Sequence, residues 1–291
     1  MSIHGLLAAD FILNPPADNW VEVIPTITEF NSIPFFWPKA AQELLPRTAK
    51  RLLDEQENNF RRDWEQFQSG YSHVASEDYM HAWFVVNTRA FYQETRQTLL
   101  YPWRDRLALL PVADLFNHAA AGCKVSYCAD SYDIIADRQY LEGEEVYTSY
   151  GEHSNDFLLA EYGFLLSHNT KDRFDPEDFV SSRLNAEETT LLKQMKTLVA
   201  LRQICGPATE EEFLRDEGWF EGTSETVDKV RLQKLLAKLL EEVERYRQDV
   251  LALNDNIQGY QTLLLQRWNQ IDELVRKAIQ LSTFENESQS T

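Results

Sequence analysis

Hydrophobic positions recur at helical spacing through most of the first ninety residues. Residues 5–13 form an amphipathic pattern that ends at Asn14-Pro15-Pro16, since proline has no N–H to continue a helix. From residue 41 to 68, apolar residues lie three or four positions apart and charged residues fill the other face, which predicts a helix ended by Gly70. A third helix is predicted to begin with Ser76 as its N-cap and to reach about Phe91.

Between the first two predicted helices, residues 20–37 combine prolines with clustered aromatic residues. This composition predicts an extended loop that its rings pin to a hydrophobic core.

The hydrophobic period changes after residue 106. Short β-branched or aromatic runs, separated by turn-forming residues, predict strands at 109–112, 124–127, 132–136 and 145–149. Ser154 is a predicted N-cap for a helix over residues 155–162, and Gly163 is its predicted left-handed terminator. This β-rich stretch is the natural place to look for a functional site.

Helical periodicity returns in the last third of the chain. Helices are predicted at 186–205, 209–217 and 225–253, with a break at 254–259 and a final helix through Leu263 to Val275. We therefore predict an α+β fold with two domains. Residues 1–170 form the first, with a helical block (about 1–95) and a β-rich half (about 105–168); residues 171–291 form an all-helical second domain.

Charge narrows the range of partners. The 291 residues include 28 Lys plus Arg and 47 Asp plus Glu, a formal net charge of −19. This balance argues against a nucleic-acid binder, which needs a basic surface. It suits a basic protein partner, although acidity that only serves solubility explains the same count.

Cys123, Cys128 and Cys205 lack the spacing of metal ligands and leave an odd thiol. They indicate a reducing compartment, the cytosol or nucleus. The sequence has no apolar run near the roughly 20 residues of a membrane helix and no signal-peptide pattern.

The polar residues best suited to binding or catalysis lie in the β-rich stretch. Asn117-His118, after Asp114, is predicted at the end of a hydrophobic strand, where both side chains could bind a ligand or tie loops together. No His or Cys partner stands at metal-ligand spacing from His118, which argues against a metal site. Tyr150 and Tyr162 could form walls of an aromatic channel for an amine or a cation, or could simply be core residues.

Taken in order, these motifs resemble a known family. Asp-Leu-Phe-Asn-His (114–118), Gly-Glu-Glu-Val (143–146) and Ser-Tyr-Gly-x-x-Ser-Asn-x-x-Leu-Leu-x-x-Tyr-Gly-Phe (149–164) resemble the C-terminal half of the SET domain. The resemblance is strongest to the branch of Rubisco large-subunit lysine methyltransferase. It covers roughly the whole chain, with the helix around Arg89, the loop at 20–37 and the C-terminal helices as its less specific parts.

The resemblance implies an S-adenosylmethionine-dependent protein-lysine N-methyltransferase that acts on a non-histone protein, such as a ribosomal protein or a translation factor. It implies that Asn117, His118, Arg89 and Asp114 bind or support the cofactor. Tyr150 would be the catalytic tyrosine, also in contact with the cofactor, and Tyr162 a second wall of the lysine channel. No dedicated base is visible in the sequence, so the lysine proton is expected to leave to water.

One part of the family pattern has no match. The glycine-containing strand pair that contacts the cofactor at the start of the SET domain is missing from the sequence. A truncated gene model, a cofactor-independent relative and a strand supplied by another chain all explain this. The alternative function is therefore an inactive SET-like module that binds a basic protein.

Overall fold

The computed structural model describes residues 1–128, 131–174, 229–253 and 259–284. It divides into two compact units. Unit 1 comprises residues 1–36, 52–153 and 159–166, and unit 2 comprises residues 37–51, 154–158 and 167–291. Each unit is described by itself, and the boundary expected near residue 170 stays a prediction.

Helices α1 (Ile3–Leu13), α5 (Ser76–Arg89) and most of α4 (Arg47–Gly70) supply the core of unit 1. Helix α1 packs against α5, and aromatic rings fill the space around them. The Phe36 and Phe84 ring centroids lie 4.7 Å apart, and those of Phe67 and Tyr79 lie 4.6 Å apart. Paired rings of this kind contribute beyond their buried area, so this core forms a firm support for the strands that follow α5.

The structure corrects several details of the predicted helices. The segment at 20–37 folds into α2 (Asp18–Val21) and the 3-10 turns η1 (Ile27–Ser32) and η2 (Pro34–Phe36), and is not an extended loop. The helix predicted over 41–68 is split into α3 (Lys39–Gln42) and α4, because Pro46 lacks the N–H that would continue α3. The N-cap of α5 is Ala75, not Ser76, and this helix ends at Arg89.

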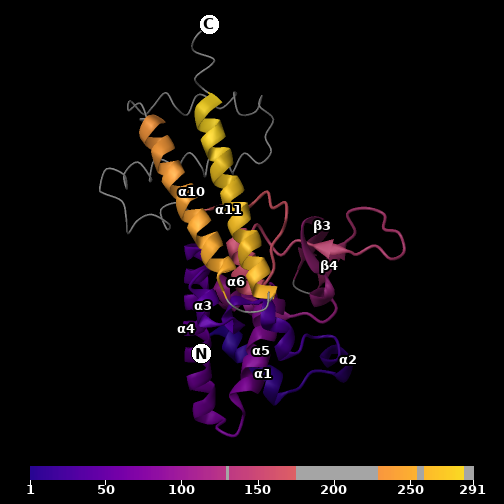
Figure 1. Cartoon of the computed structure of the whole chain (residues 1–291). Helices are drawn as coiled ribbons and strands as arrows, with labels where there is room; N and C mark the ends of the chain where they lie inside the picture. Colours follow the sequence, from indigo (N-terminus) through magenta and orange to yellow (C-terminus); the bar gives the residue numbers. More distant parts are fainter. Residues whose placement is uncertain (129–130, 175–228, 254–258, 285–291) are drawn as a thin grey trace. The chain divides into compact units, whose positions relative to one another are not determined.

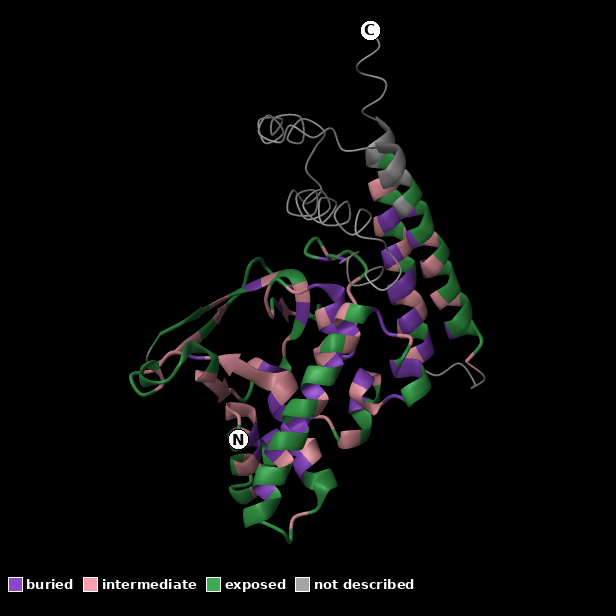
Figure 2. Cartoon of the chain, turned by 90° about the vertical axis from the view of Figure 1, so that its left-hand side faces the viewer, coloured by how far each residue is buried: buried purple, intermediate pink, exposed green. Residues whose placement is uncertain are grey.

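Two small sheets follow α5. Strand β1 (Ala90–Tyr92) pairs antiparallel with β2 (Leu107–Leu109), and the order of the second sheet is β4 (Tyr132–Ile135), β3 (Asn117–Tyr127), β5 (Tyr147–Thr148). The pairing of β3 with β4 is antiparallel, and that with β5 is parallel. The 3-10 turns η3 (Thr98–Leu100), η4 (Trp103–Asp105) and η5 (Ala113–Leu115) connect them. Buried residues concentrate in the helices, and the strands are mostly half-buried or exposed (Figure 2).

The strands differ from the predicted runs in two ways. Residues 109–112 are largely a connector, since β2 ends at Leu109, and β1 was not predicted at all. Asn117 and His118 begin strand β3, whereas the sequence pattern placed them at the end of a strand. The other predicted runs, at 124–127, 132–136 and 145–149, contain strand residues of β3, β4 and β5.

Helix α6 (Asn155–Tyr162) contributes residues to both units and has the predicted ends. The backbone N–H of Phe157 donates to Ser154 Oγ over 3.4 Å. Gly163 has a φ of +77° and follows the last helical residue, which is the left-handed cap expected from the sequence.

Replacement of Gly163 by alanine is expected to destabilise the protein by about 1–3 kcal/mol, because a left-handed φ is costly for residues with a Cβ. A Cβ there would also lie 2.7 Å from the Ser32 carbonyl carbon and 2.8 Å from Ile33 N. The matched control is Gly143→Ala, since Gly143 has a φ of +86° and no atom within 4 Å of such a Cβ. Thermal melting should show the larger loss for Gly163→Ala; equal losses would mean that the contact with Ser32 is irrelevant.

In unit 2, helices α10 (Lys229–Leu251) and α11 (Gly259–Phe284) lie side by side in antiparallel orientation (Figure 1). Their facing residues, which include Leu239, Val243, Leu264 and Ile271, are buried. The long helix and the final helix predicted from the sequence are thus present. The helices predicted at 186–205 and 209–217 lie outside the described residues, as does the break predicted at 254–259 except for Gly259, which begins α11. Among the described helices, none combines the length and apolar composition needed to cross a membrane.

Candidate functional site

The two motif segments meet where β3 and β5 run in parallel. Asn117 pairs with Tyr147, and His118 pairs with Thr148. Residues 30 positions apart in sequence are therefore neighbours, and the chain leaves this pairing directly into Tyr150. The pairing is the local reason why the predicted site residues come together.

His118 is buried and bonded to the Tyr150 backbone. The N–H of Tyr150 donates to His118 Nδ1 over 3.0 Å, and the two rings lie 5.1 Å apart. Because Nδ1 accepts, a neutral ring carries its proton on Nε2. Burial, and next the nearby His153, lowers the pKa of His118, so the ring is neutral near pH 7. His118 thus positions Tyr150 without adding charge to the site.

The rings of Tyr150 and Tyr162 contact each other, with centroids 5.2 Å apart and an interplanar angle of 50°. The Tyr150 hydroxyl donates to the carbonyl oxygen of Phe116 over 2.7 Å, which fixes the ring. Burial raises the pKa of both phenols above its ordinary value. The pair therefore presents neutral, oriented rings, which suits an amine or a cation better than an anion.

Arg89 and Asp114 form an ion pair beside these rings. Arg89 Nη1 lies 3.3 Å from Asp114 Oδ2 and donates to the Asp114 carbonyl oxygen over 2.6 Å. Trp20 Nε1 donates to the same carboxylate over 2.8 Å. However, Arg89 Nε and Asp114 Oδ1 are buried without a hydrogen-bond partner. A buried donor and a buried acceptor without partners are costly, and together they could bind a ligand that has both an acceptor and a donor.

Asn117 lies apart from this group. Its side chain is exposed, and Nδ2 donates to Glu145 Oε1 over 2.6 Å. Asn117 does not line the cavity described next. The structure thus brings together Arg89, Asp114, His118, Tyr150 and Tyr162, while the role of each stays a prediction.

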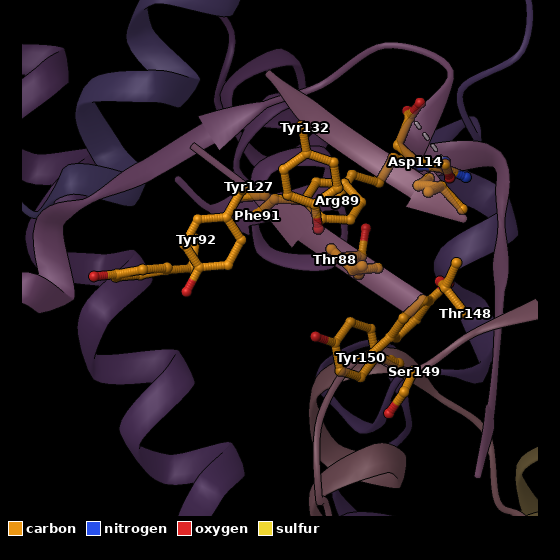
Figure 3. A pocket seen from close by; sticks show the side chains of 14 residues that line it. Thr88, Arg89, Phe91, Tyr92, Asp114, Tyr127, Tyr132, Thr148, Ser149 and Tyr150 are labelled. Atoms are coloured by element: carbon orange, nitrogen blue, oxygen red, sulfur yellow. Dashed lines mark hydrogen bonds and ion pairs between the residues drawn. The ribbon is translucent and has the colours of Figure 1, made fainter. Parts of the chain in front are cut away.

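A cavity of about 190 Å³ lies beside four of these five residues, and His118 does not line it. Arg89, Asp114, Tyr150 and Tyr162 line it, and Thr148 and Ser149 lie beside Tyr150 in Figure 3. Small-molecule sites usually measure about 300–1,000 Å³. The cavity is therefore smaller than a typical small-molecule site.

Sequence reasoning missed the other end of the cavity, where Phe91, Tyr92, Tyr127 and Tyr132 lie (Figure 3). Tyr127 and Tyr132 flank the turn between β3 and β4, which is a signal for a cross-strand aromatic pair. Phe91 and Tyr92 gave no such signal, because β1 follows α5 without a break in the apolar pattern. Within the described residues, no group of three or more His, Cys, Asp and Glu side chains is placed to hold a metal ion.

Glu161 is the residue immediately before Tyr162 of the site. Its Oε2 accepts hydrogen bonds from Gln56 Nε2 at 2.9 Å and Asn87 Nδ2 at 3.0 Å. Burial raises the pKa of Glu161 above its ordinary value of 4.5 in spite of these two bonds. Because the pKa of Glu161 is higher in the folded state, stability is highest when the pH lies below the ordinary pKa. It falls as the pH rises through the pKa of the folded state.

Glu161→Gln is therefore expected to melt at a higher temperature than the parent chain at pH 7. The difference in melting temperature should narrow as pH falls towards 4.5, the ordinary pKa of a glutamate. Below that pH the parent chain holds the Glu161 proton in both the folded and the unfolded state, so ionisation no longer changes its stability. Glu145→Gln is the control of opposite sign, since hydrogen bonds from Tyr147 and then Asn117 lower the pKa of exposed Glu145. Thermal melting across pH measures both; a lower melting temperature for Glu161→Gln at pH 7 would contradict the expectation.

Comparison with known proteins yields curated relatives, although no protein-family model matches the chain. The chain is 26% identical over 262 residues to ribosomal lysine N-methyltransferase set11 of Schizosaccharomyces pombe, covering 81% of this chain and 68% of that protein. It is 40% identical over 92 residues to human SET domain-containing protein 4, covering 30% of this chain and 21% of the relative.

A solved structure of Rubisco LSMT bound to AdoMet aligns with 97% of this chain and 75% of that chain, with 16% identity and a TM-score of 0.48. The chain spans only part of its curated relatives, down to 21% of the human protein. The relatives confirm the predicted similarity to SET-domain lysine methyltransferases. The mixed helical and sheet architecture likewise agrees with the predicted α+β class.

Proposed function

We propose that the chain is an S-adenosylmethionine-dependent protein-lysine N-methyltransferase. The observation that carries the proposal is the neutral pair Tyr150 and Tyr162, 5.2 Å apart, in a cavity that also contains the Arg89–Asp114 ion pair. The names of its relatives, ribosomal lysine N-methyltransferase among them, support the same reaction.

The residues present fit the amino-acid end of the cofactor. A carboxylate would satisfy the unpartnered Arg89 Nε, and an ammonium group would satisfy Asp114 Oδ1. We propose that His118 and Asn117 hold the cofactor at the β3–β5 pairing, with Tyr150 in contact with both cofactor and substrate. When bound, S-adenosylmethionine supplies an electrophilic methyl group on its sulfonium.

The aromatic walls would act mainly on the lysine amine. A free lysine has a pKa of about 10.4 and must lose a proton before it can attack. The rings of Tyr150 and Tyr162 exclude water from the amine, which lowers its pKa, and the Tyr150 hydroxyl orients it without charge. The proton leaves to water, since both phenols hold their own protons at neutral pH.

We further propose that the substrate is a basic, lysine-containing protein such as a ribosomal protein. The chain carries a formal net charge of −19, which increases the rate of encounter with a basic partner. Within the described residues, neither Cys123 nor Cys128 forms a disulfide, which supports location in the cytosol or nucleus.

The test is calorimetric titration of the full chain with S-adenosylmethionine, followed by transfer of a radiolabelled methyl group to ribosomal proteins. Binding and label on lysine are the expected results. Absence of binding at millimolar cofactor would overturn the proposal. Binding of ribosomal proteins without cofactor binding would instead favour the alternative, an inactive module that holds a basic partner.

A further inference from the structure

Four aromatic residues form the end of the cavity farthest from Thr148 and Tyr150 (Figure 3). We name Phe91, Tyr92, Tyr127 and Tyr132 the aromatic shelf. Phe91 and Tyr92 come from β1, Tyr127 ends β3, and Tyr132 begins β4. The methyl-transfer chemistry proposed above uses none of them.

The rings of the shelf contact one another across strands. Phe91 meets Tyr132 edge-on at 5.4 Å, and Tyr92 meets Tyr127 edge-on at 5.6 Å. Tyr127 and Tyr132 are nearly parallel, with centroids 6.2 Å apart and an interplanar angle of 13°. Packing alone would bury such a cluster. However, Tyr127 is 44% exposed, the other three residues are only half-buried, and all four line the cavity, so part of the cluster is accessible from it.

The charged groups next to the shelf form ion pairs, so among the described residues that line the cavity no unpaired positive charge repels a cation. The Tyr92 hydroxyl donates to Glu94 Oε1 over 2.6 Å, and this hydrogen bond and then Arg106 help to keep the pKa of Glu94 low. Arg106 Nη1 lies 2.7 Å from the same oxygen, so its charge is already paired. Among the described residues that line the cavity, Arg89 is the only cation, and it is paired with Asp114.

We propose that the aromatic shelf binds a second cationic side chain, a lysine or arginine that neighbours the methylated lysine in the same protein substrate. This rests on the proposed function. The faces of tyrosine rings attract cations through their quadrupole, and an arginine guanidinium can also stack on them. The shelf would thus select basic sequence context, whereas Tyr150 and Tyr162 would hold the reacting lysine.

The test uses fluorescein-labelled peptides with a central lysine in an alanine and glycine background. Each carries one further residue at a position from −4 to +4, which is arginine in one peptide and uncharged citrulline in its match. Fluorescence anisotropy with the full chain measures binding. At one or more positions, arginine is expected to bind about 3- to 30-fold more tightly than citrulline, which corresponds to the strength of a cation–π contact.

Variants locate the effect. Tyr127→Leu and Tyr132→Leu should each reduce the ratio of arginine to citrulline binding towards one, whereas Tyr127→Phe should keep it, because the ring remains. The matched control is Tyr147→Leu, since Tyr147 lies on β5 and outside the cavity. Circular dichroism melting tests whether each variant is folded; if one leucine variant fails to fold, the other gives the answer.

The proposal would be overturned if the parent chain bound the arginine and citrulline peptides equally well. It would also be overturned if a folded leucine variant kept the parent's preference for arginine. Failure of the proposed function is distinguishable, because binding is measured without methyl transfer. Arginine-selective binding that depends on Tyr127, with no transfer to any peptide, would retain the shelf as a cation site and count against the enzyme. Methyl transfer with no arginine preference would support the enzyme and count against the shelf as a cation site.

Discussion

Replacement of Tyr150 by phenylalanine is expected to lower the rate of methyl transfer by about 100-fold, with little change in cofactor binding. The change removes the hydroxyl that donates to the Phe116 carbonyl and that would orient the lysine amine. The ring and its contact with Tyr162 remain. Loss of alignment of reacting groups costs on the order of 100-fold in rate. Single-turnover transfer of a radiolabelled methyl group to ribosomal proteins measures the effect.

Tyr147→Phe is the matched control, because the Tyr147 hydroxyl donates to exposed Glu145 and does not reach the cavity. It should keep nearly full activity. Titration calorimetry with S-adenosylmethionine should give similar affinities for both variants. Full activity in Tyr150→Phe would remove Tyr150 from the catalytic role, whereas an equal loss in both variants would point to a general effect on the fold.

The sequence allowed the central part of the site to be predicted because its signals are local. Gly163 after a helical run indicates a left-handed cap, and Ser154 before it indicates an N-cap. Tyr150 before a glycine indicates a turn at a strand end. The ordered motifs then placed Asn117 and His118 near Tyr150. The parallel pairing of β3 with β5 brings His118 into contact with Tyr150, whereas Asn117 lies apart.

Features set by tertiary contacts could not be predicted in the same way. Strand β1 follows α5 directly, and a short apolar run such as Phe91-Tyr92 is compatible with either helix or strand. Its conformation is decided by pairing with β2, which lies 15 or more residues later. The burial of Arg267 could not be predicted either, because a charged residue in a helical pattern normally marks the solvent face.

The buried ion network around Arg267 stabilises unit 2. Arg267 is fully buried; its Nε donates to Asp156 Oδ1 over 2.7 Å, and its Nη1 donates to Asp172 Oδ2 over 2.6 Å. Asp172 Oδ1 also accepts from the backbone N–H of Asn155 over 2.9 Å. One guanidinium thus joins α11 to the first turn of α6 and to the segment around Asp172. Its planar fork suits two carboxylates at once.

Arg267→Met is expected to destabilise the protein by about 3–5 kcal/mol, because two buried carboxylates lose their shared cation. For a chain of this size, that corresponds to a fall of roughly 6–20 °C in melting temperature. Lysine should restore only part of the loss, since it cannot form the same fork. Addition of Asp156→Asn and Asp172→Asn to Arg267→Met should recover stability, since it removes the uncompensated charges.

Arg276→Met is the matched control on the same helix. Arg276 is exposed and pairs with Asp272 one turn away, and solvent-exposed pairs of this kind contribute little to stability. Thermal melting should therefore separate the two variants widely. Similar, small losses for Arg267→Met and Arg276→Met would mean that Asp156 and Asp172 find other partners or take up protons. If the two carboxylates take up protons, the loss of stability in Arg267→Met should grow as pH rises, because the unpaired carboxylates must then ionise inside the fold.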